Sequence, residues 1–263
     1  MVDCPGFSVI LILNHKRKPL NLKKMKLQKE YALVKENLLD WKPEFDKLEK
    51  RGFIRTTASG DLAVGHTLES QFGVEPNSVP KPDLGNVEVK GARKSSSSSK
   101  QTLFCLESWV IDQREYLEKY GWVNRKGTKF SAMQTINTNI NKHGFFLSID
   151  SSYVSIVSEE DVIWQCGLEE IQERFNQKFP ACLKVFADSY GKGWEEYFHY
   201  NEVILYKNVD RDRFLKLLQE GHISIEIRLE TKNDWFTLNN YGTAFRISHD
   251  KMNLLFEKEA IWA

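Results

Sequence analysis

The most regular alternation of hydrophobic and polar positions runs through residues 222–230, where aliphatic residues alternate with Ser224, Glu226, Arg228 and Glu230. Because successive side chains of a strand point to opposite faces, the pattern predicts a strand with one apolar and one polar face. Residues 242–248 show the same alternation. If the two strands pair, Arg228 and Arg246 lie on one polar face.

Shorter patterns predict the other elements. Alternation predicts a hairpin over residues 145–157, and apolar runs predict strands over 183–187 and 202–206 and a buried strand over 102–106, beside the strand that carries Glu88. Apolar residues at helical spacing predict helices over 168–175 and 214–218, and two short helices between 27 and 50, interrupted by Pro43.

Composition indicates a folded globule and excludes several classes of site. A chain of 263 residues with 41% hydrophobic residues can bury a core as one domain or as two packed lobes. Its net charge is only +1, so a DNA-binding surface requires its 37 Lys and Arg to gather on one face. The four cysteines (Cys4, Cys105, Cys166 and Cys182) form no C-x-x-C pair, which indicates reduced thiols in a cytoplasmic protein rather than a zinc site or a disulfide framework.

The N-terminal segment does not predict a membrane protein. The apolar run over residues 7–13 is too short to span a bilayer and lacks the features of a signal peptide. It is predicted to be a strand or a packed extension. The basic stretch that follows either contacts phosphates or forms a solvated arm.

The candidate chemistry lies in residues 82–90. Val87 and Val89 alternate with Glu88 and Lys90, so both charged groups leave one face of a strand, roughly 6 to 7 Å apart. The turn formers between Asp83 and this strand allow the Asp83 carboxylate to fold back beside Glu88. Two carboxylates suit Mg²⁺, and the ammonium could hold an attacking water. The alternative from spacing alone is the solvated face of an amphipathic strand.

A second acidic residue precedes this segment. Leu68 and Phe72 are four residues apart and Gly73 suits a C-terminal cap, so residues 65–73 are predicted to form a short helix. This helix would carry Glu69 towards the strand carboxylates.

The order of these motifs resembles a known family. Gly-x-Thr-Leu-Glu at 65–69, Pro-Asp-Leu-Gly at 82–85 and Glu-x-Lys at 88–90 are similar to the MvaI/BcnI family of type II restriction endonucleases, relatives of the MutH mismatch-repair nickase in the PD-(D/E)xK superfamily. Residues 102–104, 198–202 and 242–246 also resemble family motifs. The resemblance extends roughly from Phe45 to the C-terminus.

The resemblance implies an α/β fold of the PD-(D/E)xK type, a mixed sheet flanked by helices with a DNA-recognition lobe. The expected division is an N-terminal extension over 1–26, a catalytic lobe over 27–161 and a recognition lobe over 162–263. Asp83 and Glu88 are expected to hold Mg²⁺ and Lys90 to position and activate the attacking water. Glu69 is expected to orient Lys90 or to complete the outer metal shell.

Two groups of residues are expected to bind DNA. In the serine-rich loop after the catalytic strand, Arg93, Lys94, Ser96 and Ser97 could hold phosphates; a flexible loop is the alternative. On the polar strands, arginine suits guanine and a carboxylate accepts from cytosine, so Glu226, Arg228 and Arg246 are expected to read bases. A salt-bridged outer face is the alternative there.

The expected function is sequence-specific cleavage of double-stranded DNA. Family members act as monomers that nick the two strands in turn at short CC-N-GG sites, and a cognate DNA methyltransferase is an expected partner. Two alternatives remain: a MutH-like nickase that cuts one strand, and a DNA-binding protein that keeps the nuclease fold without cleaving.

Overall fold

The structure is a computed structural model that describes residues 41–74, 81–95, 99–159 and 161–262. The extension over 1–26, the start of the expected catalytic lobe at residue 27, Ser96 and Ser97 lie outside these ranges. The first described helix, α2 (Trp41–Glu49), contains Pro43 in its first turn, where proline is tolerated because that N–H has no partner within the helix.

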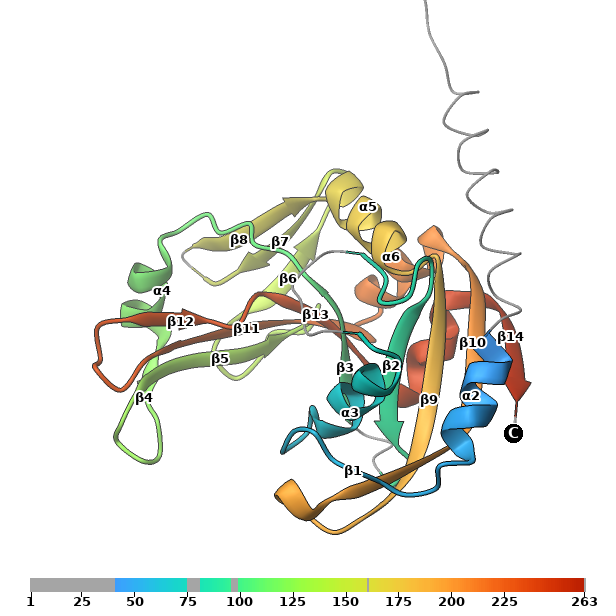
Figure 1. Ribbon diagram of the computed structural model, residues 1–263. Coiled ribbons are helices and arrows are strands. Elements are labelled where there is room, and N and C mark those ends of the chain that lie inside the picture. Colours follow the sequence, from blue (N-terminus) through green and yellow to red (C-terminus); the bar gives the residue numbers. More distant parts are fainter. Residues whose placement is uncertain (1–40, 75–80, 96–98, 160, 263) are drawn as a thin grey trace, which may run out of the picture. The chain divides into compact units, whose positions relative to one another are not determined.

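A five-stranded mixed sheet, here called the β2 sheet, carries the candidate chemistry (Figure 1). It contains β1 (Ile54–Arg55), β10 (Tyr197–Val209), β9 (Ala181–Tyr190) and β2 (Glu88–Arg93), with β14 (Phe256–Trp262) paired to β10. Only β2 and β9 pair in parallel. Helix α3 (Ala63–Gln71) packs on β2, and α2 packs on β10. The predicted mixed sheet flanked by helices is therefore confirmed.

A second sheet, the β11 sheet, is antiparallel throughout. It contains β3 (Lys100–Cys105), β13 (Ala244–Ser248), β11 (Ile223–Thr231), β5 (Phe130–Ile136) and β4 (Trp122–Val123), with β12 (Leu238–Asn240) paired to β11. Ser224 lies opposite Arg246, which places Arg228 and Arg246 on one face as predicted.

The remaining elements complete the core. A three-stranded sheet of β6 (Phe146–Ile149), β7 (Tyr153–Val157) and β8 (Val162–Gly167) confirms the predicted hairpin. The helices are α4 (Gln113–Tyr120), α5 (Leu168–Lys178) and α6 (Arg211–Gln219), and the 3₁₀ segments are η2 (Gly193–Glu195) and η3 (His249–Leu255). One buried cluster draws on all three sheets and includes Phe104, Phe175, Phe214 and Phe245. The ring centroids of Phe104 and Phe214 each lie 4.5 to 6.3 Å from those of the other three rings.

The prediction that the strand over residues 102–106 lies beside the Glu88 strand is wrong. The strand pairs with β13 in the β11 sheet and not with β2, although it follows β2 directly in the chain. Consecutive strands are neighbours in only about two-thirds of cases, and here the chain leaves one sheet for the other after β2. Each large sheet also takes strands from both sides of residue 161, and the expected division into lobes there stays a prediction.

Among the helices described, none combines the length and the apolar character that crossing a membrane requires.

Candidate active site

A tight turn brings Asp83 back to the first residues of β2. Leu84 and Val87 exchange backbone hydrogen bonds of 3.0 and 2.9 Å across the turn, and Gly85 adopts a φ of +61°, which glycine takes without strain. The Asp83 carboxylate then accepts a 2.9 Å hydrogen bond from the backbone N–H of Val89. The bend predicted from the turn formers is present.

The Glu88 carboxylate is fully buried, and the Lys90 ammonium donates a hydrogen bond to its Oε1. Burial raises the pKa of Glu88, because removing a carboxylate from water disfavours its charged form. Burial by itself lowers the pKa of Lys90, but the nearby Glu88 and Asp83 carboxylates outweigh this effect and raise it. Lys90 therefore stays protonated at neutral pH, so it can donate hydrogen bonds but cannot accept a proton.

Sequence reasoning missed a second lysine at this site. Lys178, the last residue of α5, places its ammonium 2.8 Å from Glu88 Oε2 and 3.6 Å from Asp83 Oδ1. It also donates a 2.9 Å hydrogen bond to the carbonyl of Lys81. No local sequence signal points to it: α5 leads into β9, and only the pairing of Cys182 on β9 with Glu88 in the parallel ladder brings the end of α5 to the start of β2.

Helix α3 holds Glu69 beside these groups. The helix ends as predicted, with Gly73 at a φ of +68° and the N–H of Val74 bonded to the Glu69 carbonyl, as in a Schellman motif. Burial raises the pKa of Glu69, and the Asp83 charge raises it further, while Lys90 lowers it. The charges of Asp83 and Lys90 therefore both act on the Glu69 carboxylate.

Glu69 and Lys90 line one cavity of about 440 Å³, with Gln101, Arg246 and His249 on other walls. Sequence reasoning also missed His249, whose only signal was its place directly after β13. Burial lowers the pKa of His249 to about 4, so this ring is neutral at pH 7 and adds no positive charge to the cavity.

The donor set fits a magnesium ion that keeps several of its waters. Mg²⁺ is commonly held by one or two protein carboxylates plus water, and Asp83 and Glu88 supply two. Within the part of the chain that the structure describes, no three acidic, histidine or cysteine side chains converge as a metal centre. Neither role expected for Glu69, to orient Lys90 or to complete the outer metal shell, requires it to be a direct ligand.

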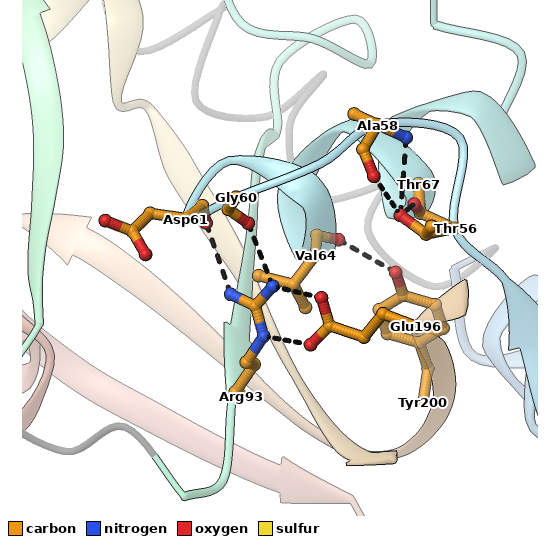
Figure 2. Close-up of polar contacts among 9 residues, drawn as sticks. All are labelled: Thr56, Ala58, Gly60, Asp61, Val64, Thr67, Arg93, Glu196 and Tyr200. Atoms are coloured by element: carbon orange, nitrogen blue, oxygen red, sulfur yellow. Dashed lines mark hydrogen bonds and ion pairs between the residues drawn. The ribbon is translucent and has the colours of Figure 1, made fainter. Parts of the chain in front are cut away.

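Arg93, which is expected to contact DNA, makes several hydrogen bonds within the protein (Figure 2). Its guanidinium donates to both carboxylate oxygens of Glu196, at 2.6 and 2.7 Å, and to the carbonyls of Gly60 and Asp61, at 3.0 and 3.3 Å. The Arg93 and Glu196 side chains are only 17% and 10% exposed. Four of its five N–H groups have partners within the protein, which leaves little capacity to bind a phosphate.

The same region ties α3 to the β2 sheet. The hydroxyl of Tyr200 on β10 donates a 2.8 Å hydrogen bond to the carbonyl of Val64, and Thr67 accepts from the N–H of Thr57 (Figure 2 shows Tyr200, Val64 and Thr67). Arg93 on β2 holds the loop before the same helix. These contacts fix the helix that carries Glu69.

Lys94 is better placed than Arg93 to meet an external anion. Its side chain is 35% exposed, and its ammonium lies 3.3 Å from Glu202. An ion pair this exposed contributes little to stability, so Lys94 can exchange its partner.

On the polar face of the β11 sheet, Arg246 donates to Glu226 at 2.6 Å and to the carbonyl of Lys100 at 2.5 Å. Arg228 donates to the carbonyls of Gly242 and Tyr241, at 3.2 and 2.5 Å. The alternative considered for this face was a set of salt bridges, and Glu226 and Arg246 do form one. Arg246 also lines the cavity that contains Lys90, so this face and the carboxylate site are adjacent.

Comparison with known proteins adds independent information. The solved structure titled restriction endonuclease MvaI-cognate DNA substrate complex is similar to this chain, with a TM-score of 0.71 and 21% identity over 86% of this chain and 97% of that one. MvaI in the absence of DNA matches with 20% identity over 84% and 96% of the chains and a TM-score of 0.47. No curated protein sequence matches significantly.

The first of these likenesses shows a shared fold. The decisive match is to a family model, that of the MvaI/BcnI restriction endonuclease family, which covers residues 43–256 and so includes the Asp83 turn, both lysines and the polar face of the β11 sheet. The protein is a site-specific deoxyribonuclease, and the chain belongs to the MvaI/BcnI restriction endonuclease family.

Proposed function

We propose that this restriction endonuclease hydrolyses phosphodiester bonds of double-stranded DNA with Mg²⁺ bound by Asp83 and Glu88. Type II restriction endonucleases generally use a divalent metal. The observation that carries the proposal is the fully buried Glu88 carboxylate, which shares the Lys178 ammonium with Asp83 and accepts a hydrogen bond from Lys90, a residue that lines the cavity. A bound metal ion would supply Lewis-acid stabilisation of the charge that develops on the phosphoryl oxygens.

The protein's own side chains would orient the reaction. Lys90 remains an ammonium, because its pKa is raised, and would hold the attacking water by hydrogen bonding and offset the negative charge of the transition state. Glu69 faces the same cavity and would keep the Lys90 ammonium in position. Asp83 is held by the Val89 N–H, which fixes one ligand oxygen before the metal binds.

The polar face of the β11 sheet would read the bases. Glu226, Arg228 and Arg246 offer the donors and acceptors that distinguish guanine and cytosine, and in the structure they bond to one another or to backbone carbonyls. These internal bonds would be exchanged for base contacts on binding. A short CC-N-GG-like site is the proposed target, and Lys94 is a proposed phosphate contact.

The cleavage claim is tested on supercoiled plasmid with Mg²⁺. Glu88→Gln and Lys90→Met are expected to slow cleavage by at least about 10³-fold, because each removes a group that acts on the transition-state charge. Glu173→Gln, an exposed position on α5, is the control and is expected to cleave like the wild type. Inertness of the wild-type protein towards many DNA sequences with several divalent metals would rule the proposal out.

The course of the reaction is a separate proposal. We propose that the enzyme acts as a monomer with one active site and nicks the two strands in turn, so nicked circles should accumulate before linear DNA. A stable dimer that cuts both strands in one binding event would contradict this account. Nicked circles with no linear product would favour the MutH-like alternative, and binding without cleavage would favour the non-cleaving one.

Two further points follow from a restriction function. We propose the cytoplasm as the location, since the enzyme must meet DNA, and a cognate DNA methyltransferase as the partner that protects host sites. Run-off sequencing of cleaved DNA would give the recognised site and the cut position together, and methylation at that site should block cleavage.

A further inference from the structure

We infer that the Lys178 ammonium occupies the place that the divalent cation takes, so that metal binding must displace Lys178 from the carboxylates. The inference rests on the proposed function in one respect: it takes Asp83 and Glu88 as the metal ligands. It goes beyond that function by giving the protein an internal competitor for its own metal.

The geometry distinguishes the two lysines at the site. Lys90 bonds to Glu88 Oε1, whereas Lys178 lies 2.8 Å from Glu88 Oε2 and 3.6 Å from Asp83 Oδ1. Lys178 is thus the cation that both carboxylates share. A metal ion bound by both would be drawn to the same position between them.

The balance of charge explains why an ammonium is there. The Asp83 and Glu88 side chains are 12% and 0% exposed, and two ionised carboxylates so far from water are costly unless cations compensate them. Lys90 and Lys178 together neutralise the pair. Lys178 therefore reduces the cost of burying both carboxylates in the folded protein before any metal arrives.

Because both are cations, the metal ion and the Lys178 ammonium cannot occupy the site together. A divalent cation and an ammonium within a few Å of each other repel strongly in a site with little water. The two lysine side chains are equally exposed, at 16% each. Lys178 is the lysine able to leave, because it is the last residue of α5 and its carbonyl partner belongs to the exposed residue Lys81. Lys90 retains its place because it projects from β2 into the cavity wall.

The test measures metal binding directly, without DNA and without cleavage. Mn²⁺ is titrated into the full-length protein, and free Mn²⁺ is followed by electron paramagnetic resonance. Lys178→Met is expected to bind Mn²⁺ at least about tenfold more tightly than the wild type, because the competing charge is gone. Lys178→Arg keeps the charge and is expected to bind no more tightly than the wild type. Lys81→Met removes a nearby exposed lysine charge and is the control.

Thermal unfolding supplies a second readout. In EDTA, Lys178→Met is expected to melt below the wild type, because the buried carboxylates lose a counter-charge. Saturating Mn²⁺ should then raise the melting temperature more in Lys178→Met than in the wild type, since tighter binding stabilises the native state more. If Lys178→Met does not fold in EDTA, Mn²⁺ is added and circular dichroism is recorded: recovery of the fold supports the inference, and no recovery overturns it.

The outcomes separate this inference from the proposed function. A wild-type protein that binds no Mn²⁺, or a Glu88→Gln variant that binds as the wild type does, would refute the metal site itself. If Glu88→Gln loses binding while Lys178→Met binds with wild-type or weaker affinity, the metal site stands and the displacement of Lys178 is refuted.

Discussion

At the scale of single residues, Glu69 combines a functional position with a cost in stability. Its pKa lies above the ordinary value of 4.5, mainly because of burial, so the ionised form is disfavoured in the folded state. Between pH 4.5 and the raised pKa the folded state binds more protons than the unfolded state, and the free energy of unfolding falls as pH rises. Above the raised pKa, the free-energy cost of holding the ionised Glu69 in the folded state no longer changes with pH.

We therefore predict that Glu69→Gln raises the melting temperature at pH 7 while slowing cleavage by about tenfold or more. The melting temperatures of the variant and the wild type should converge as the pH falls below 4.5, because the wild-type carboxyl then becomes protonated in both states. Thermal unfolding at the two pH values checks the first part and plasmid cleavage the second. A variant that is less stable than the wild type at pH 7 would contradict the assignment of a buried, disfavoured charge.

Arg93 and Lys94 are adjacent in sequence and are predicted to behave oppositely. Arg93→Met is expected to lower the free energy of unfolding by about 3 kcal/mol, because it leaves the Glu196 carboxylate without its partner in a protected site. Urea unfolding measures this loss. Lys94→Met should leave stability nearly unchanged, since its pair with Glu202 is exposed.

DNA binding, measured by fluorescence anisotropy at several salt concentrations, completes the comparison. Lys94→Met should weaken binding and reduce the slope of log affinity against log salt by about 1, as expected for one lost phosphate contact. Arg93→Met should leave that slope unchanged at temperatures where it is folded. A reduced slope for Arg93→Met would show that Arg93 does contact a DNA phosphate.

The limits of sequence reasoning are visible at these residues. The Asp83 turn and the Glu88 strand were predictable because Gly85 and the alternation of valines are local signals. Lys178 was not, since only the parallel pairing of β2 with β9 brings the end of α5 to Glu88. The internal contacts of Arg93 were not predictable either, because its partner, Glu196, lies in a distant hairpin that no local pattern connects to β2.

At the scale of elements, the close approach of α3 to β2 depends on a glycine. A Cβ at Gly91 would lie 2.9 Å from the carbonyl oxygen of Val64 and 3.1 Å from the Cα of Gly65, both backbone atoms of α3. The helix would have to move away from the strand, and Glu69 would move with it. The distance between helix and strand is thus a condition for the catalytic arrangement.

Gly91→Ala is therefore predicted to lower the free energy of unfolding by about 1–3 kcal/mol and to reduce cleavage more than DNA binding. Gly65→Ala, on the other side of the same contact, is the matched control, because a Cβ there meets no atom within 4 Å. It should be stabilising by up to about 1 kcal/mol, as expected for glycine to alanine within a helix. Equal losses in the two variants would show that packing at Gly91 is not the cause.

The individual strands were easier to predict than the strands with which they pair. The strand at β3 was recognised from its apolar run, but its partner was not, because apolar character does not specify which sheet a strand joins. The pairing of β11 with β13, which the sequence offered only as a condition, is present in the structure, with Ser224 opposite Arg246.

At the scale of the whole molecule, the two large sheets share a chain that passes between them repeatedly. Strands β2, β9, β10 and β14 belong to one sheet, and β3, β5, β11 and β13, which alternate with them along the chain, belong to the other. We predict that fragments 41–161 and 162–263, expressed separately, are both unfolded by circular dichroism and regain native structure when mixed. Cooperative unfolding of either fragment alone would contradict this prediction.

The alternation of strands between the sheets also restricts how this lineage can acquire new target sites. A recombination event with a single breakpoint between β3 and β11 would replace part of each sheet and disrupt both of them. New specificity is then expected from point substitutions on the polar face of β5, β11 and β13. Descendants with altered targets should therefore differ at scattered codons, and a mosaic gene with a single breakpoint should be inactive.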